Sequence, residues 1–306
     1  MKSLAVFILM TISSLNIPAG KGSEEPAEAG QNQKPVFSFG IIADVQFADA
    51  DPAGTRYYRC SEKKLKEALS VFSKDSVDFV ITLGDLIDRD LKSYDPINSI
   101  MESSGLKFYN VPGNHDYAFD KGKKIKLPSG YIKKPGYFSF IHKGYKFIFL
   151  NGNEISTYSS NNKAKIRNAQ ALLDTLKKRG EQNAVDWNGG IGIKQLSWLD
   201  GQMNEAVSNN EKVFIICHFP VFPENIHNLL NYKDILQILN KYQNTIAWFN
   251  GHNHAGNYGN VNSSHFVTFK GMVETENQNS FARVDVYRNK IWINGSGREK
   301  SQILAH

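Results

Sequence analysis

The stretch Phe79–Asp88 reads FVITLGDLID, an apolar run followed by a turn that carries two carboxylates. Phe79–Leu83 has the β-branched and aromatic composition of a buried strand, and Gly84 ends the run. In open α/β sheets, binding sites form where the carboxyl ends of strands open into loops. The stretch therefore predicts a buried strand that presents Asp85 at such an edge.

The same arrangement, an apolar run followed by metal-competent side chains, recurs at four other places in the chain. The five motifs are Asp44-Val45-Gln46, Gly84-Asp85-Leu86-Ile87-Asp88, Gly113-Asn114-His115-Asp116, Cys217-His218 and Gly251-His252-Asn253-His254. Taken alone, the first two motifs are also explained by a turn residue or a helix cap and Cys217-His218 by a core pair, whereas the Gly-Asn-His-Asp and Gly-His-x-His motifs are stronger signals. Together they supply carboxylates, amides and imidazoles, which bind Mn²⁺, Fe²⁺ and Zn²⁺. Two metals about 3.5–4 Å apart need such a set, with one carboxylate shared.

Helical periodicity separates several of these runs. Leu65, Leu69 and Phe72 share one face of a helix predicted over 61–72, and a second helix is predicted over 193–207. After residue 250 only β-type runs follow. Alternating strands and helices followed by hairpins predict an α/β fold with mixed sheets.

The first residues have the layout of a secretory signal peptide. Lys2 precedes an apolar run over 4–12 and a segment of small and polar residues up to 20. We therefore expect a signal peptide over 1–20, a flexible tether over 21–35 and a single domain over 36–306. The protein would then be secreted or periplasmic, with no stable membrane span after cleavage. An uncleaved N-terminal anchor is the alternative.

The composition of the chain limits the kinds of binding partner that we expect. The chain has 306 residues and a formal charge of +6, and its lysines form short runs without a concentrated basic, aromatic face. We therefore expect no nucleic-acid polymer as partner. Cys60 and Cys217 are the two cysteines, too few for a disulfide scaffold. We interpret both as structural thiols, although a single disulfide stays open, and we expect a monomer.

In this order, the five motifs resemble the calcineurin-like metallophosphoesterase superfamily, whose pattern is D-x-H, G-D-x-x-D, G-N-H-D/E, H and G-H-x-H. The resemblance runs from about Phe37 to the C-terminus. Gln46 stands where most of the superfamily has histidine, and this exchange is similar to the manganese-dependent ADP-ribose/CDP-alcohol diphosphatase family. Other segments support the closer match: Arg56-Tyr57-Tyr58-Arg59, Gly189-Gly190-Ile191-Gly192, His218-Phe219-Pro220-Val221-Phe222-Pro223, Asn231-Tyr232-Lys233-Asp234 and Gly271-Met272-Val273-Glu274-Thr275.

The resemblance implies a four-layer α-β-β-α sandwich of two mixed β-sheets flanked by helices. It also implies two divalent ions, with Mn²⁺ expected and Fe or Zn as alternatives. The first ion would be held by Asp44, Gln46, Asp85 and His254, and the second by Asp85, Asn114, His218 and His252. A metal-bridging hydroxide would attack phosphorus in line. His115 would stabilise the transition state or protonate the leaving oxygen, and Asp116 would orient His115 or a ligand histidine.

Substrate contacts follow less directly. Arg56 and Arg59 are candidates for a second phosphate, or else for a salt bridge at the start of a helix. Tyr58, Phe219 and Tyr258 are candidates for stacking on a base, or else core residues. His227 is a further candidate contact. Gly189, Gly190 and Gly192 predict a turn before a helix, because no strand precedes them as a phosphate-binding loop requires.

The implied substrate is a small nucleotide-type molecule. The function expected is a metal-dependent hydrolase that cleaves the phosphoanhydride of nucleoside-diphosphate-X compounds such as ADP-ribose and CDP-alcohols. One alternative keeps the same metal centre in a broader phosphomonoesterase or cyclic-nucleotide phosphodiesterase. A more distant one is a secreted binding protein without turnover.

Overall fold

The computed structural model describes residues 34–117 and 135–306, and Pro35–His306 form one compact unit. The predicted signal peptide and nearly all of the predicted tether lie outside the described residues. The helices are α1 (Cys60–Lys74), the 3-10 helix η1 (Leu91–Ser93), α2 (Tyr94–Ser103), α3 (Lys163–Lys178), α4 (Ile193–Ser208) and α5 (Tyr232–Leu239). The strands are β1 (Phe37–Ile42), β2 (Phe79–Thr82), β3 (Phe108–Asn110), β4 (Phe138–His142), β5 (Tyr145–Phe149), β6 (Lys212–Ile216), β7 (Thr245–Asn250), β8 (Asn257–Val261), β9 (Ser264–Thr268), β10 (Ser280–Val286), β11 (Lys290–Gly297) and β12 (Gln302–Ala305).

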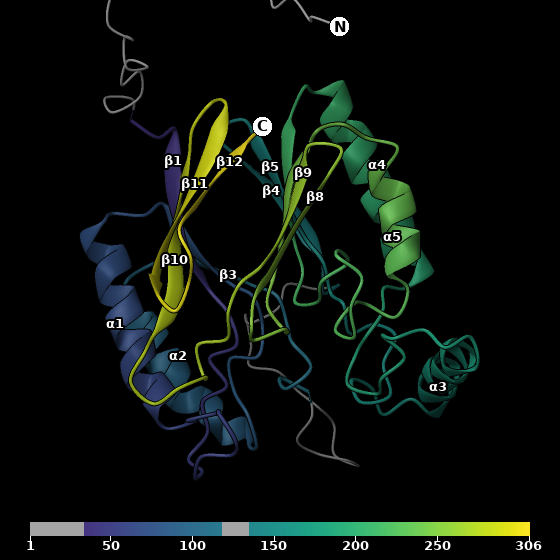
Figure 1. Ribbon diagram of the computed structural model, residues 1–306, viewed down its shortest axis with the longest axis horizontal. Helices are drawn as coiled ribbons and strands as arrows, with labels where there is room; N and C mark the ends of the chain where they lie inside the picture. Colours follow the sequence, from purple (N-terminus) through teal and green to yellow (C-terminus); the bar gives the residue numbers. More distant parts are fainter. Residues whose placement is uncertain (1–33, 118–134) are drawn as a thin grey trace, which may run out of the picture. The chain divides into compact units, whose positions relative to one another are not determined.

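The strands form two mixed six-stranded sheets. The first has the order β12-β11-β10-β1-β2-β3, in which β1, β2 and β3 run parallel. The second has the order β4-β5-β6-β7-β9-β8, with a parallel centre from β5 to β9. The predicted mixed sheets are therefore confirmed, and so is the four-layer sandwich. Figure 1 shows α1 and α2 on the outer face of the first sheet and α4 and α5 on that of the second.

The layering follows from strands that are apolar on both faces. Successive side chains of a strand point to opposite sides. On β5, Phe147 and Phe149 enter the core between the sheets, whereas Ile148 packs toward the outer core of the second sheet. On α1, Leu65 and Phe72 repeat at helical spacing and pack on the first sheet. Near-continuous apolar runs of this kind are typical of sheets covered on both faces.

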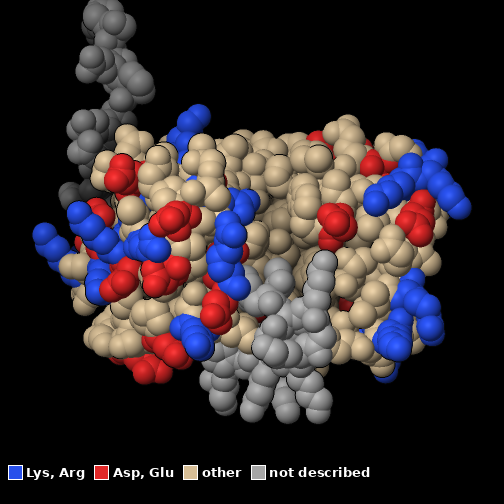
Figure 2. Space-filling view, turned by 90° about the horizontal axis from the view of Figure 1, so that it is seen from below, with Lys and Arg blue, Asp and Glu red and all other residues tan. Residues whose placement is uncertain are grey.

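Several elements extend or add to the sequence-based assignment. The helices predicted over 61–72 and 193–207 are α1 and α4, each slightly longer than predicted. Helices α2, α3 and α5 and strands β4, β8 and β12 were not predicted. Within the described residues, no helix is long and apolar enough to span a bilayer. On the face in Figure 2, lysines and arginines lie among aspartates and glutamates in the part of the surface that is described.

Candidate metal centre

The five motifs lie in loops that follow β1, β2, β3, β6 and β7, and these loops pack very closely. A Cβ atom added to Gly113 would lie 2.0 Å from Oδ1 of Asp85, and one added to Gly251 would lie 2.5 Å from Oδ2 of Asp44. Glycine is therefore required at both places, because only a residue without a side chain lets the neighbouring loop approach.

Four of the candidate ligands have a left-handed backbone conformation. The φ angles are 51° for Asp44, 43° for Gln46, 53° for Asp85 and 67° for His252. Such a conformation costs of the order of 1–3 kcal/mol for a residue other than glycine and collects at functional sites. The loops thus accept strain in order to aim these side chains at one point.

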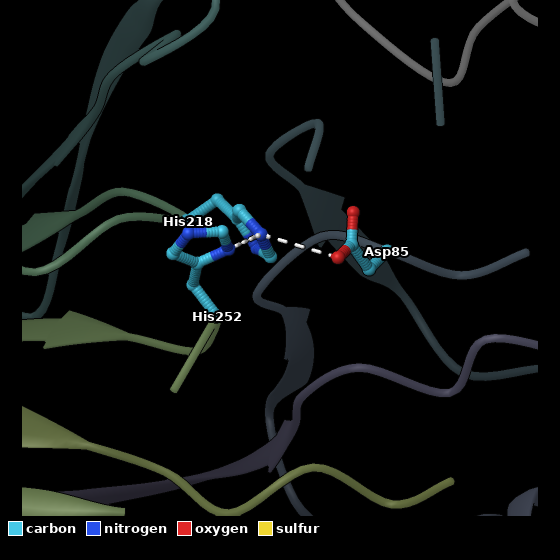
Figure 3. A group of neighbouring side chains, drawn as sticks. All are labelled: Asp85, His218 and His252. Carbon is cyan, nitrogen blue, oxygen red and sulfur yellow. Dashed lines mark hydrogen bonds and ion pairs between the residues drawn. The ribbon is translucent and has the colours of Figure 1, made fainter. Parts of the chain in front are cut away.

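His218 lies at the centre of one group of contacts, which Figure 3 shows in part. Its Nε2 is 3.3 Å from Oδ2 of Asp85, 3.1 Å from Nδ1 of His252 and 3.1 Å from Oδ1 of Asn114. One donor atom each from Asp85, His218 and His252 lies within 4.8 Å of the others, and all three residues are buried. This group has the donors and spacing to hold a divalent cation.

Gln46 lies in a second group that shares Asp85 with the first. Its Nε2 is 3.2 Å from Oδ2 of Asp85 and 3.3 Å from Nε2 of His254, and that nitrogen is 3.5 Å from Oδ1 of Asp44. Within the described residues, Oε1 of Gln46 is buried without a hydrogen-bond partner. A cation binds an amide through oxygen, so turning the amide over would satisfy this atom. The second group therefore offers donors of the same kinds as the first and shares Asp85 with it.

Each candidate histidine has its far ring nitrogen held by an oxygen atom. Nδ1 of His218 is 2.7 Å from the carbonyl oxygen of Leu83, and Nε2 of His252 is 2.9 Å from Oδ1 of Asn188. Nδ1 of His254 is 2.7 Å from Oε1 of Glu274. These acceptors hold the far ring nitrogens, so that the opposite nitrogen of each ring faces the centre and can bind a cation once it has lost its proton.

The charges in the centre depend strongly on one another. Burial opposes a charge on His218, but Asp85 outweighs it and raises the pKa of His218 to about 9. Burial likewise opposes a charge on His254, whose pKa Asp44 raises to about 9. Burial and then the charge of His218 lower the pKa of His252 well below its usual value. Protons thus balance the carboxylates in the metal-free protein, and a bound cation would displace them.

His115 lies beside the ligands and contacts a carboxylate that we did not predict for it. Nδ1 of His115 is 3.2 Å from Oδ1 of Asp88, and its backbone N–H donates to Oδ1 of Asp85 at 2.8 Å. Asp116 accepts the backbone N–H groups of Gly113 and Asp85 at 2.8 and 2.9 Å, so its carboxylate holds two of the strand-end loops together. The role expected for Asp116, to orient His115 or a ligand histidine, stays a prediction.

The predicted aromatic contacts are mostly buried or already bonded. Tyr58 is 2% exposed and Phe219 is fully buried, so neither can stack on a base in this conformation. Tyr58 packs under Arg89, whose guanidinium carbon is 5.1 Å from the ring centroid. Phe219 packs against His252 with 4.6 Å between the ring centroids. Tyr258 is 45% exposed, and its hydroxyl is 2.9 Å from Nδ1 of His265.

The two predicted arginines differ. Arg59 binds Asp49 at 2.6 Å and Asp51 at 2.7 Å on the surface, so its guanidinium is already paired. This is the salt bridge that we gave as the alternative. Arg56 lies 3.9 Å from Oδ2 of Asp88, the carboxylate that contacts His115. Of the two, only Arg56 is adjacent to the candidate centre through these contacts.

Four residues near the centre had no predicted role: Asp88, Trp187, Asn188 and Glu274. Asp88 and Glu274 belong to motifs quoted above, so the sequence did offer a signal for them. Trp187 and Asn188 precede the glycine turn at 189–190, and nothing in their local sequence indicates that Asn188 contacts His252.

Comparison with known proteins agrees with this geometry. The family model for calcineurin-like phosphoesterases matches residues 37–256. The manganese-dependent ADP-ribose/CDP-alcohol diphosphatase of Xenopus laevis is 27% identical, with 93% of this chain and 95% of that protein covered. The protein of that name in Arabidopsis thaliana is 28% identical, with 88% and 97% covered.

A solved structure shares the fold. A dimetal phosphatase from Danio rerio superposes with a TM-score of 0.79 at 24% identity, and 89% of this chain and 99% of that chain are covered. The donor set also fits a divalent metal ion. With the family model covering more than half of its length, the chain belongs to the calcineurin-like phosphoesterase family and is a metal-dependent phosphoester hydrolase.

Proposed function

We propose that this enzyme is a diphosphatase that hydrolyses the phosphoanhydride of nucleoside-diphosphate-X compounds such as ADP-ribose and CDP-alcohols. The observation that carries the proposal is Gln46, an amide in contact with both Asp85 and His254 where most of the superfamily has histidine. The relatives named as ADP-ribose/CDP-alcohol diphosphatases match this chain over nearly its whole length, which supports the same substrate class.

The residues suit two divalent ions, for which Mn²⁺ is proposed. Asp85 belongs to both contact groups and is the proposed shared ligand. Asp44, Gln46 and His254 would complete one site, and the other would use Asn114, His218 and His252. When bound, the ions supply Lewis acidity and a water made acidic enough to ionise near neutral pH.

His115 is the proposed general acid. Asp88 holds Nδ1 of His115, which leaves Nε2 to carry a proton toward the leaving oxygen. Burial opposes its charge, but the carboxylates of Asp85 and Asp88 raise the pKa of His115 above that of a free histidine. A proton held at that nitrogen is what departure of a phosphate or alkoxide requires. Asp88 is a positioning residue in this scheme, and Arg56 is placed to contact a second phosphate.

A substrate panel tests the function. Metal-stripped enzyme reloaded with Mn²⁺ would be assayed with ADP-ribose, CDP-choline, a cyclic nucleotide and p-nitrophenyl phosphate. We expect kcat/KM to be highest for the first two, with a nucleoside monophosphate released. Preference for the last two would replace the diphosphatase by a broader phosphoesterase. Metal binding with no turnover on any of them would favour a binding protein.

We further propose that the enzyme is secreted or periplasmic and monomeric. The first part rests on residues 1–20 alone, and N-terminal sequencing of the protein from fractionated cells tests it. An intact Met1 on protein recovered from the cytoplasm would contradict secretion. Size-exclusion chromatography with light scattering tests the monomer, and a mass near twice 34.4 kDa for the full chain would contradict it.

A further inference from the structure

Three aromatic rings meet beside the candidate centre, and two of them have no role in the reaction proposed above. The ring centroids of Trp187 and His252 are 5.2 Å apart, those of Trp187 and His227 are 5.2 Å apart, and those of His227 and His252 are 5.5 Å apart. His252 is buried, whereas Trp187 and His227 are half-buried. The cluster therefore leads from a candidate ligand to the surface.

Asn188 fixes these rings relative to the ligand. Its Oδ1 is 2.9 Å from Nε2 of His252, and its Nδ2 donates to the carbonyl oxygen of Ile226 at 2.7 Å. Trp187 directly precedes Asn188 in the chain, and His227 directly follows Ile226. The side-chain amide of Asn188 thus contacts the ring of the candidate ligand His252 and also joins the loops that carry Trp187 and His227. Groups held in this way keep a defined distance from the reacting centre.

Packing against His252 does not by itself explain the outer rings. The fully buried Phe219 already packs against His252 at 4.6 Å between centroids. An indole left partly in water forgoes part of the free energy that burial of its apolar surface would give. Aromatic surface that remains accessible beside a site is therefore available to a ligand. Of the aromatic residues predicted from sequence, Tyr58 and Phe219 lack this property because they are buried, whereas Tyr258 is 45% exposed and its hydroxyl contacts His265.

We propose that Trp187 and His227 form the surface that binds the planar base of the substrate next to its reacting phosphate. This inference rests on the proposed function, in which the substrate carries a nucleoside. Stacking on an aromatic ring tolerates every base, because each base has a π-face. A stacking surface would thus accept both the adenine of ADP-ribose and the cytosine of CDP-alcohols. A site that recognised the base by hydrogen bonds would instead discriminate between these two bases.

The test compares ligands with and without a base. Isothermal titration of the Mn²⁺-loaded full chain with AMP, CMP and ribose 5-phosphate gives three dissociation constants, and phosphate release is followed to verify that the ligands stay intact. In Trp187→Leu we expect the Kd for AMP and CMP to rise about 5- to 150-fold, the loss of one base-stacking contact. The Kd for ribose 5-phosphate should stay within about two-fold, since it contributes no base.

Three further variants test the interpretation. Trp187→Phe keeps an aromatic face, so AMP affinity should be close to wild type while the quenching of tryptophan fluorescence by AMP is lost. Trp292→Phe, on β11, removes another indole that is 39% exposed and should leave both affinity and quenching unchanged. His227→Leu should weaken AMP and CMP binding selectively, as Trp187→Leu does. Metal content of every variant is measured in parallel.

The outcomes separate this inference from the function on which it rests. If Trp187→Leu weakens AMP and ribose 5-phosphate equally, or if Trp187→Phe still shows full quenching, the two rings do not bind the base. The diphosphatase can still be active in that case. If the substrate panel shows no diphosphatase activity while base-dependent binding is lost in Trp187→Leu, the base site stands and the reaction is a different one.

Discussion

The two sheets contribute different chemistry to the candidate centre. The loops after β1, β2 and β3 of the first sheet supply oxygen donors, from Asp44, Gln46, Asp85 and Asn114. The loops after β6 and β7 of the second sheet supply ring nitrogens, from His218, His252 and His254. The centre thus exists only where the two sheets pack together.

The two halves also hold their donors differently. On the oxygen side, Asp44, Gln46 and Asp85 adopt positive φ angles of 51°, 43° and 53°, so the backbone itself aims three of the four donors. On the nitrogen side, His252 also has a positive φ angle, 67°, but all three rings are held by hydrogen bonds to their far ring nitrogens, as with Glu274 at 2.7 Å from His254. Changes on the oxygen side should therefore disrupt the centre, whereas changes behind the histidines should tune it.

The largest effect is expected for Asp85, which contacts both halves. Asp85→Ala should lose most bound metal and all measurable turnover, because Gln46, His218 and the backbone of His115 lose a common partner. Metal analysis of purified protein and the ADP-ribose assay measure this. Asp85→Asn is the matched control for backbone strain, since asparagine tolerates positive φ. An Asn variant with full metal content and normal turnover would contradict the shared-ligand role.

His115 should separate turnover from metal binding. Its side chain lies against Asp88 rather than among the donor atoms, so His115→Ala should lower kcat by about 10²–10⁴-fold, as loss of a general acid does. Metal content should stay at the wild-type level. If the variant is purified without metal, His115 is a ligand, and the assignment of roles on the oxygen side is wrong.

Glu274 tests whether a hydrogen-bond partner of His254 changes the affinity of the centre for metal. Glu274→Gln removes the charge beside Nδ1 of His254 and should weaken metal binding by about 10–100-fold, as outer partners of ligand histidines do. Asn188→Ala removes the acceptor behind His252 and should likewise weaken metal binding. Calorimetric titration of the apoprotein with Mn²⁺ measures both. If the wild type and the two variants bound Mn²⁺ with equal affinity, the hydrogen bonds behind the histidines would not tune the centre, and the contrast between the oxygen side and the nitrogen side would be wrong.

Proton release provides a smaller test of the same half. The pKa of His218 and that of His254 are raised to about 9 by Asp85 and Asp44, which overcome burial. Below pH 9 both rings must lose a proton when metal binds, so affinity should rise with pH, about tenfold per pH unit for each proton displaced. The dependence should flatten above pH 9. Titrations in buffers of different ionisation enthalpy count the protons, and none released at pH 7.5 would contradict these charges.

The sequence predicted what is local in this molecule. Apolar runs and the polar residues directly after them predicted the strands and their carboxyl ends, whereas the four layers were predicted from the family resemblance. Contacts that depend on the packing of distant loops were not predictable in that way. Nothing near Asn188 indicates His252 as its partner, because 64 residues separate them. Helix α3 was not predicted, although its buried residues Ala169, Leu173 and Leu176 lie at helical spacing.

The smallest effects on activity are expected for the two arginines of the Arg56-Tyr57-Tyr58-Arg59 segment. Substituting them compares a residue beside the candidate centre with one on the surface. Arg59 pairs with Asp49 and Asp51, whose side chains are 87% and 91% exposed, and exposed ion pairs contribute only about 0–1 kcal/mol.

Arg59→Ala should therefore leave kcat/KM for ADP-ribose within about two-fold of wild type, since its partners are surface carboxylates. Arg56→Ala should raise KM about tenfold, because the side chain beside Asp88 is the one placed to form a charge-assisted bond with a second phosphate. Steady-state kinetics on both variants measure this. A large loss in Arg59→Ala would mean that its guanidinium leaves the two aspartates to bind substrate. Equal, small effects of the two substitutions on KM would mean that neither arginine of this segment binds the second phosphate.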